Sequence, residues 1–186
     1  MSITEWIGAI TCLLCIWLAA RQNVWTWPVA LVSVSAYFIF FYQIKLYADM
    51  LLQVFFLISN LYGWYEWKRG GQGKTELPVT WLSHIQTVGV ILAGVGCSIL
   101  LAWYFRKFTD AAYPAVDSTL AAFSVVAQIL LTRKKIENWI IWFVADVVYV
   151  WLYFTKGAYV TAGVYLILVF LAVQGFYEWR KSSRTA

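Results

Sequence analysis

Seven apolar stretches, separated by short polar connections, fill almost the whole of this 186-residue chain. Most of them approach the roughly 20 residues that a helix needs to cross a bilayer. Only 12% of the residues are charged, whereas soluble domains carry about 25%. The pattern predicts an all-α integral membrane protein with seven transmembrane helices, and it leaves no room for a soluble catalytic or nucleotide-binding domain. The expected spans are residues 5–20, 25–43, 46–66, 81–105, 118–132, 138–155 and 158–178.

Basic residues are distributed unevenly between the two sets of connections. Four Lys and Arg residues are expected on one side, namely Lys45, Arg106, Lys107 and Lys156. Ten are expected on the other side, namely Arg21, Lys68, Arg69, Lys74, Arg133, Lys134, Lys135, Arg180, Lys181 and Arg184. The positive-inside rule places the ten in the cytoplasm, with the N-terminus outside and the C-terminus inside. The net charge of +5 is therefore interpreted as a topology signal, with anionic lipid as a secondary contact and no nucleic-acid partner.

The chain aligns with itself, without a gap, when it is shifted by 112 residues. Residues 21–69 and 133–181 share nine identities in 49 positions, and both segments end in Tyr-Glu-Trp followed by two basic residues. Three helices, one linker helix and three further helices predict two parallel repeats about an axis along the membrane normal. This is a transporter architecture in which the site lies at the repeat interface near the midplane. The predicted units are 1–69, a loop and linker helix at 70–112, and 113–186 with a short cytoplasmic tail.

The sixth span, "ENWIIWFVADVVYVWLYF", carries a carboxylate at membrane depth. Asp146 lies ~12 Å beyond Asn138 at about 1.5 Å per residue, where insertion of a charge costs ~3 kcal/mol. At about 100° per residue, six polar or aromatic side chains share one face of this helix. They are Asn138, Trp139, Trp142, Asp146, Tyr149 and Tyr153. Aromatic planes beside a buried anion suit a flat cationic or hydrogen-bonding ligand. The alternative is that Trp139 and Tyr153 are interfacial anchors and Asp146 pairs with another protein group.

Two further spans place amides at membrane depth. Gln53, Asn60 and Trp64 share one face of the third span, and Ser124 and Gln128 are i, i+4 neighbours on the fifth. Either a ligand or hydrogen bonding between helices explains such amides. The internal alignment also pairs Trp142 with Ala30 and Asp146 with Val34, so most of the polar chemistry is expected in the second half.

Metal and catalytic chemistry find little support in the sequence. Cys12 and Cys15 form a C-x-x-C without a second pair, and His84 is the sole histidine. The cysteines are interpreted as small packing residues and the histidine as an interfacial residue. Because no paired intramembrane acids and no Cys/His set are found, we expect no metal, no cofactor and no catalytic residue. An intramembrane enzyme and a non-transporting receptor or scaffold are the competing hypotheses.

The segments "QIKLYADMLLQVFFLISNLYGWYEW", "LLTRKKIENWIIW" and "AVQGFYEW" resemble the PnuC family of bacterial vitamin transporters, and the resemblance runs from the first helix to the last. It implies a seven-helix core like that of the sugar-transporting SWEET proteins and a homotrimer in the bacterial inner membrane. It also implies uptake of nicotinamide riboside by facilitated diffusion, with phosphorylation by a cytoplasmic kinase to trap the product. Relatives in that family carry thiamine, riboflavin or deoxynucleosides.

The resemblance also implies binding residues. The family's positions map onto Gln53, Asn60, Trp139, Trp142, Asp146 and the seventh helix near Tyr165. With Trp64, Gln128, Asn138 and Tyr149, they form the expected substrate site. Asp146 departs from the family pattern, in which nicotinamide riboside transporters have Asn. An ionised Asp only accepts hydrogen bonds, whereas an Asn also donates them to a carboxamide. Nicotinamide riboside is the first expectation because it is the commonest substrate in the family. Thiamine, whose aminopyrimidine can donate to Asp146, is a close second.

Overall fold

The structure is a computed structural model that describes residues 3–43, 47–108, 114–155, 157 and 159–184. In these ranges the chain forms seven α-helices and one short 3₁₀ turn, so the predicted all-α fold class is confirmed. The elements are α1 (Ile3–Ala20), α2 (Thr26–Gln43), α3 (Tyr47–Arg69), η1 (Gln72–Lys74), α4 (His84–Phe108), α5 (Pro114–Thr132), α6 (Glu137–Thr155) and α7 (Tyr159–Ser182). Lys45 and Lys156, which were counted in the charge distribution above, lie outside the described part.

The helix boundaries follow the apolar stretches, with two informative differences. α5 begins at Pro114, four residues before the expected span, because proline presets the first turn of a helix and lacks only an N–H that would be unpaired there. α3 and α7 continue to Arg69 and Ser182, since basic residues in a last turn complement the helix dipole. Among the described residues, four helices are long and apolar enough by themselves to cross a membrane, and segments 6–20 and 26–40 form shorter apolar helices.

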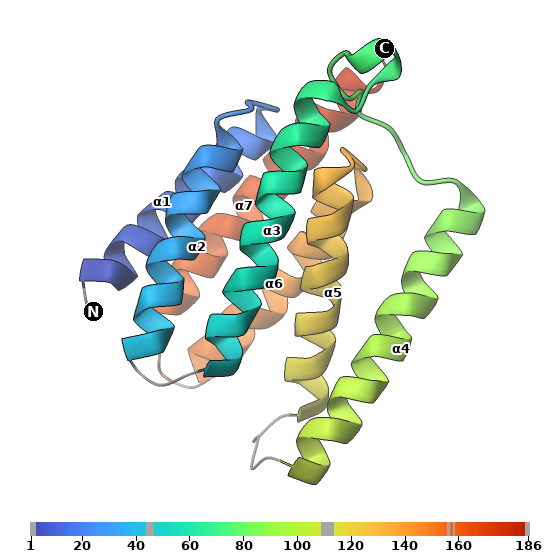
Figure 1. Ribbon diagram of the computed structural model, residues 1–186. Helices are drawn as coiled ribbons and strands as arrows, with labels where there is room; N and C mark the ends of the chain where they lie inside the picture. The colour runs from blue at the N-terminus through green and yellow to red at the C-terminus, as the bar shows by residue number, and fades with distance from the viewer. Residues whose placement is uncertain (1–2, 44–46, 109–113, 156, 158, 185–186) are drawn as a thin grey trace.

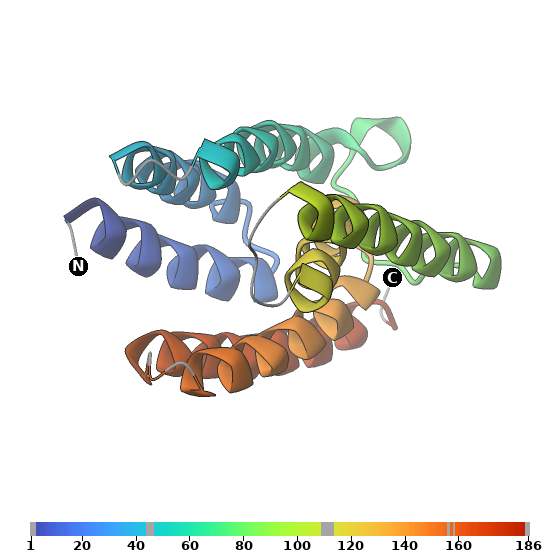
Figure 2. The same ribbon diagram turned by 90° about the horizontal axis from the view of Figure 1, so that it is seen from below.

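The helices form one bundle in which successive helices run in opposite directions (Figure 1). The connections α1–α2, α3–α4 and α5–α6 lie at the same end as the C-terminus, and the N-terminus lies at the other end. We call the first of these the basic end, because it contains the ten Lys and Arg residues assigned to one side above. Seen along the bundle, α2 and α3 lie on one side, α6 and α7 lie on the other, and α1 and α5 lie between them (Figure 2).

The linker helix α4 lies at the edge of the bundle, against α5 (Figures 1 and 2). The contact uses small residues, since an added Cβ on Gly94 would come closer than 3.0 Å to the ring of Phe123. Ser98 is buried one turn further on and donates to the Gly94 carbonyl. Most of the remaining surface of α4 is apolar and exposed, for example at Ile85 and Leu100, as a lipid-facing helix requires. We refer to α1–α3 as the first unit and to α5–α7 as the second.

The two units turn in the same way at the basic end. Gln22 has φ 55° and Lys134, 112 positions later, has φ 48°. The N–H of Gln22 donates to the Ala19 carbonyl at 2.9 Å, and the N–H of Lys134 donates to the Leu131 carbonyl at 3.1 Å. Left-handed backbone is uncommon for residues with a side chain, so its recurrence at this spacing shows that both units build the same turn.

The packing of tryptophan on glycine is also repeated. An added Cβ on Gly63 would come closer than 3.0 Å to the ring of Trp27, and one on Gly175 would do the same to the ring of Trp139. Each glycine therefore lets an indole lie directly on the backbone of a neighbouring helix. Four indoles that are at most 2% exposed form the tryptophan cluster at the basic end of the bundle. Its members are Trp27, Trp67, Trp139 and Trp179.

The connection between α3 and α4 covers this cluster from the basic end. The N–H of Leu77 donates to the Trp67 carbonyl at 3.1 Å. Thr80 forms a parallel bridge with the second unit, donating to the Lys134 carbonyl and accepting from the N–H of Ile136, both at 3.1 Å. Desolvation lowers the pKa of Lys134, although nearby Glu76 opposes that shift. The connection is thus bonded to both units.

Candidate substrate site

A cavity of about 550 Å³ lies between the two units. Ligand sites in proteins are typically hollows of ~300–1,000 Å³, so the space suits a small organic molecule. Its walls come from all six helices of the two units, and Phe105 of α4 also contributes.

The lining residues are paired by the 112-residue shift. Eight such pairs contribute both members to the cavity, which places it on the internal symmetry of the bundle. They are Cys12/Ser124, Ile16/Gln128, Ala30/Trp142, Val34/Asp146, Tyr37/Tyr149, Gln53/Tyr165, Phe56/Leu168 and Asn60/Ala172.

The paired positions match in place but differ in chemistry. Asp146, Trp142 and Gln128 come from α6 and α5, whereas Val34, Ala30 and Ile16 hold the equivalent positions on α2 and α1. In the third helix of each unit the polar residue is in the first unit instead, since Asn60 of α3 is polar and its counterpart Ala172 of α7 is not. The result is a polar wall formed by α3, α5 and α6 and a mainly apolar wall formed by α1, α2 and α7.

Asp146 is the most unusual member of the polar wall. It is 4% exposed, and no salt bridge to it is found among the described residues. A buried carboxylate normally requires a paired cation or a hydrogen-bond donor. The side chain therefore favours a site in which a cationic ligand supplies the partner.

Aromatic side chains of α6 and α7 line the same cavity as this carboxylate. Trp139 and Trp142 line the cavity, and their buried indole N–H groups have no hydrogen-bond partner among the described residues. Buried indole N–H groups usually find an acceptor, so a ligand oxygen is a suitable one here. Tyr149 stacks on Tyr165 with ring centroids 4.6 Å apart, and Tyr153 stacks on Tyr165 at 5.3 Å.

The amides of α3 and α5 meet at the cavity wall. The Nε2 of Gln128 donates to Oδ1 of Asn60 at 2.9 Å and to Oγ of Ser59 at 3.3 Å. With its oxygen engaged in this way, Asn60 keeps its two N–H donors for other partners. Gln53 lines the cavity about two turns away on the same helix, at ~3.6 residues per turn.

The structure brings eight of the ten predicted site residues to this one cavity. They are Gln53, Asn60, Gln128, Trp139, Trp142, Asp146, Tyr149 and Tyr165. Trp64 lies one turn nearer the basic end than Asn60 and packs against the tryptophan cluster. The Nζ of Lys68 lies over its ring, 5.6 Å from the ring centroid. Asn138 is fully buried in the first turn of α6, where its Nδ2 donates to the Lys135 carbonyl at 2.6 Å. Neither of these two is among the lining residues.

Several lining residues were not singled out by sequence reasoning. Cys12 and Cys15, interpreted as packing residues, line the cavity, and so do Ser33, Val34 and Tyr37 of α2. A helical stripe of polar residues could not reveal them, because this wall is mainly apolar. The 112-residue shift could have done so, since Val34 and Tyr37 occupy the positions equivalent to Asp146 and Tyr149.

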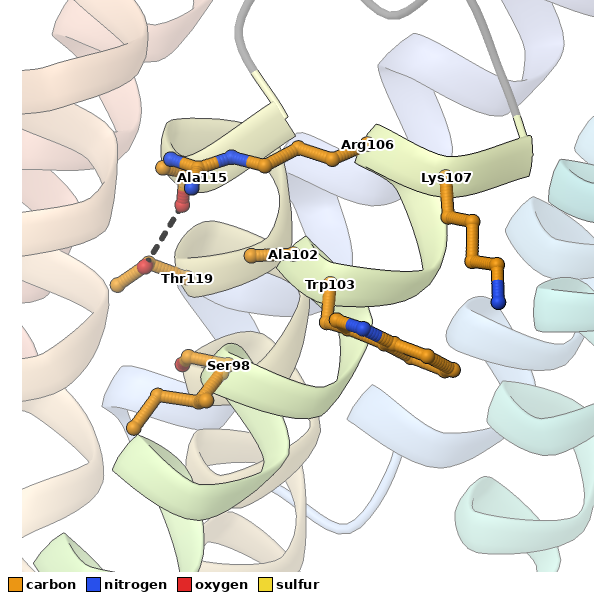
Figure 3. Close-up of a pocket in the computed structure, with 8 residues that line it drawn as sticks. Ser98, Ala102, Trp103, Arg106, Lys107, Ala115 and Thr119 are labelled. Atoms are coloured by element: carbon orange, nitrogen blue, oxygen red, sulfur yellow. Dashed lines mark hydrogen bonds between the residues drawn. The ribbon is translucent and has the colours of Figure 1, made fainter.

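A second hollow lies between the end of α4 and the start of α5 (Figure 3). Arg106 reaches across it toward Ala115, whereas Lys107 points away. The bond drawn there joins Thr119 Oγ1 to the Ala115 carbonyl at 2.8 Å, within α5 itself. None of the predicted site residues lines this hollow, and its ionisable groups are cations, so it lacks the chemistry of the central cavity.

Comparison with known proteins identifies the group to which this chain belongs. The family model described as nicotinamide mononucleotide transporter matches residues 2–181. The chain belongs to this family. The prediction of a relationship to PnuC proteins is confirmed, because the nicotinamide riboside transporter PnuC of Escherichia coli is 34% identical and the alignment covers 99% of this chain and 87% of that protein.

A second relative is named for a different substrate. The riboflavin/roseoflavin transporter RibM of Streptomyces davaonensis is 28% identical, with 97% of this chain and 86% of that protein covered. A crystal structure of the vitamin B3 transporter PnuC has the same fold, with a TM-score of 0.75 at 23% identity, covering 96% of this chain and 81% of that chain. These relatives are transporters, which supports the prediction of a membrane transporter and not an enzyme.

Proposed function

We propose that this protein takes up a cationic B vitamin, with nicotinamide riboside as the first candidate. The observation that carries the proposal is Asp146, a buried carboxylate without a protein cation, beside two indoles in a cavity between the units. Nicotinamide riboside is a flat permanent cation, and aromatic faces attract such groups. The 34% identity to a protein named as a nicotinamide riboside transporter supports this choice.

Each part of the cavity has a proposed role. Trp142 stacks on the heterocycle above a floor formed by Trp139, and Asp146 balances the charge of the ring. Gln53 and Asn60 bond the carboxamide or the sugar. Gln128 holds the amide of Asn60, and Tyr149 and Tyr165 extend the aromatic wall. Trp64 and Asn138 support this arrangement from outside the cavity, through packing at the basic end.

Transport is proposed to occur by facilitated diffusion through alternating exposure of one site. Among the described cavity residues, the second carboxylate is Asp117, which is exposed at the start of α5, so the cavity offers no buried pair of acids for proton exchange. Net uptake then requires trapping, which phosphorylation by a cytoplasmic kinase supplies. The protein is proposed to work as a homotrimer in the bacterial inner membrane, with the basic end and C-terminus in the cytoplasm.

Thiamine is the alternative substrate, and the identity of residue 146 favours it specifically. An ionised carboxylate accepts hydrogen bonds and cannot donate them, which suits the amino group of an aminopyrimidine as well as a positive charge. Riboflavin is the third candidate because of the 28% identity to a riboflavin transporter, but it is uncharged and leaves Asp146 without a partner.

A binding screen tests the proposal. Purified protein would be titrated calorimetrically with nicotinamide riboside, thiamine, riboflavin and a deoxynucleoside under the same conditions. The proposal expects the tightest binding for nicotinamide riboside and weaker or no binding for the uncharged compounds. Tight binding of riboflavin alone would refute the cation assignment, and tight binding of thiamine alone would select the alternative.

A further inference from the structure

The central cavity extends from the basic end of the bundle toward the opposite end. Asp117, a lining residue at the start of α5, is exposed, and this helix end lies opposite the basic end. Trp139 lines the cavity toward the basic end and is 1% exposed. The structure therefore closes the cavity at the basic end.

The closing layer is the tryptophan cluster. Behind Trp139, the ring of Trp179 follows at 5.4 Å between centroids, then Trp67 at 5.7 Å and Trp27 at 5.1 Å. All three contacts are edge to face, the geometry that aromatic pairs prefer. Four indoles thus form a continuous layer between the cavity and the covering connection at Leu77 and Thr80.

Two hydrogen bonds cross between the units within this layer. The Nε1 of Trp67 on α3 donates to the Leu131 carbonyl on α5 at 3.1 Å. The Nε1 of Trp179 on α7 donates to the Ala19 carbonyl on α1 at 3.0 Å. The two donors, Trp67 and Trp179, are related by the 112-residue shift, and so are the two acceptors. The two bonds are therefore equivalent contacts of the internal repeat.

The contacts within each unit are of a different kind. Trp27 lies on Gly63 inside the first unit, and Trp139 lies on Gly175 inside the second, in both cases without room for a methyl group. The ring contact that crosses between the units is Trp67 on Trp179. The boundary between the two units therefore divides the cluster into two rigid halves. It passes between the rings of Trp67 and Trp179 and crosses the two indole–carbonyl hydrogen bonds.

We propose that Trp67 and Trp179 close the transport path at the basic end, and that substrate leaves the cavity there when their two indole–carbonyl bonds break. This inference rests on the proposed transport function. Both residues act on transport through Trp139 and the position of the units, since neither lines the cavity. The covering connection moves in the same step, because it is bonded to Trp67 and to Lys134.

Cysteine accessibility tests the closure without any substrate. A chain with Cys15→Ser and Cys97→Ser retains Cys12, a cavity-lining thiol. A membrane-impermeant methanethiosulfonate reagent would be applied to membrane vesicles of each orientation. We expect Cys12 to react from the end opposite the basic end and to react slowly from the basic end.

Phenylalanine variants remove the two donors and keep aromatic rings. Trp67→Phe and Trp179→Phe should each raise the rate of labelling from the basic end roughly fivefold, and the double variant roughly 25-fold, the effect of one and two net hydrogen bonds. Trp151→Phe is the matched control, because Trp151 is exposed on the outer face of α6 and should change nothing.

Folding of each variant would be checked by gel filtration and melting. If the double variant does not fold, the two single variants decide the question by the same criterion. Folded variants that label from the basic end at the control rate would overturn the proposal, and so would a parent protein that labels equally from both ends. Neither result depends on which vitamin is carried, so failure of the closure is distinguishable from failure of the proposed function.

Discussion

Trp67 and Trp179 lie 112 positions apart in the sequence and meet edge to face, with ring centroids 5.7 Å apart. Each donates its indole N–H to a backbone carbonyl of the opposite unit, at Leu131 and Ala19. The Tyr-Glu-Trp ending that reveals the internal repeat in the sequence therefore also joins the two units. Trp179 lies directly behind the cavity-lining Trp139, with ring centroids 5.4 Å apart, so this junction between the units is next to the cavity.

Gly63→Ala and Gly175→Ala should each destabilise the protein by about 1–3 kcal/mol, the usual cost of overpacking. The added methyl group would come closer than 3.0 Å to the ring of Trp27 or Trp139, and both indoles are buried. The measurement is the melting temperature of purified variants in detergent. The control is Gly89→Ala on α4, where an added Cβ meets nothing within 4 Å, and helix propensity favours alanine by up to ~1 kcal/mol. Equal melting temperatures for all three variants would contradict the packing described.

Asp146→Asn should weaken binding of nicotinamide riboside by at least about 30-fold, because loss of one partner of a buried charge pair costs about 2–5 kcal/mol. The sharpest comparison uses dihydronicotinamide riboside, the uncharged reduced form of nearly the same shape. The parent protein should prefer the cation, and the variant should lose most of that preference in calorimetric titrations. Glu178→Gln, an exposed carboxylate near the end of α7, is the control. An unchanged preference in Asp146→Asn would show that the carboxylate does not pair with the ligand.

Asn60 and Gln128 should behave as a coupled pair. Their side chains share a hydrogen bond of 2.9 Å between α3 and α5, and contacting residues typically show coupling energies of about 0.5–3 kcal/mol. A double-mutant cycle with Asn60→Ala and Gln128→Ala, read by ligand affinity, should give a coupling in this range. Purely additive effects would mean that Gln128 does not act through Asn60.

Trp142 should contribute through both its ring and its N–H group. Trp142→Ala should weaken binding by about 1–3 kcal/mol, the size of base–aromatic stacking, whereas Trp142→Phe should lose only about 1 kcal/mol with the N–H donor. Fluorescence or calorimetric titration measures both effects. Trp151→Ala on the outer face of α6 should leave the affinity unchanged. An equal loss at Trp142 and Trp151 would point to general destabilisation of the helix.

The fold could be predicted from the sequence because hydrophobic spans dominate it. α1, α2 and α6 lie within two residues of their expected bounds, since a chain in a bilayer satisfies its backbone groups within each helix. The stripe on α6 was predictable for the same reason, because helical periodicity fixes which side chains share a face. Five of its six members line the cavity.

The remaining parts of the site depend on packing between helices, which periodicity does not describe. Asn138 shares the angular position of the stripe, but it lies in the first turn of α6, and its amide bonds the Lys135 carbonyl instead of facing the cavity. Trp64 shares a face with Asn60 but lies one turn beyond the cavity floor. The apolar wall at Ala30 and Val34 carries no polar signal, and the internal repeat alone connects it to the site.

Uptake into proteoliposomes tests the central claim most directly. Labelled nicotinamide riboside would be added to vesicles that contain the purified protein, an Asp146→Asn variant or no protein. The account predicts saturable entry that stops when inside and outside concentrations are equal, needs no ion gradient and falls strongly in the variant. Entry no faster than into protein-free vesicles, for nicotinamide riboside and for thiamine alike, would contradict it.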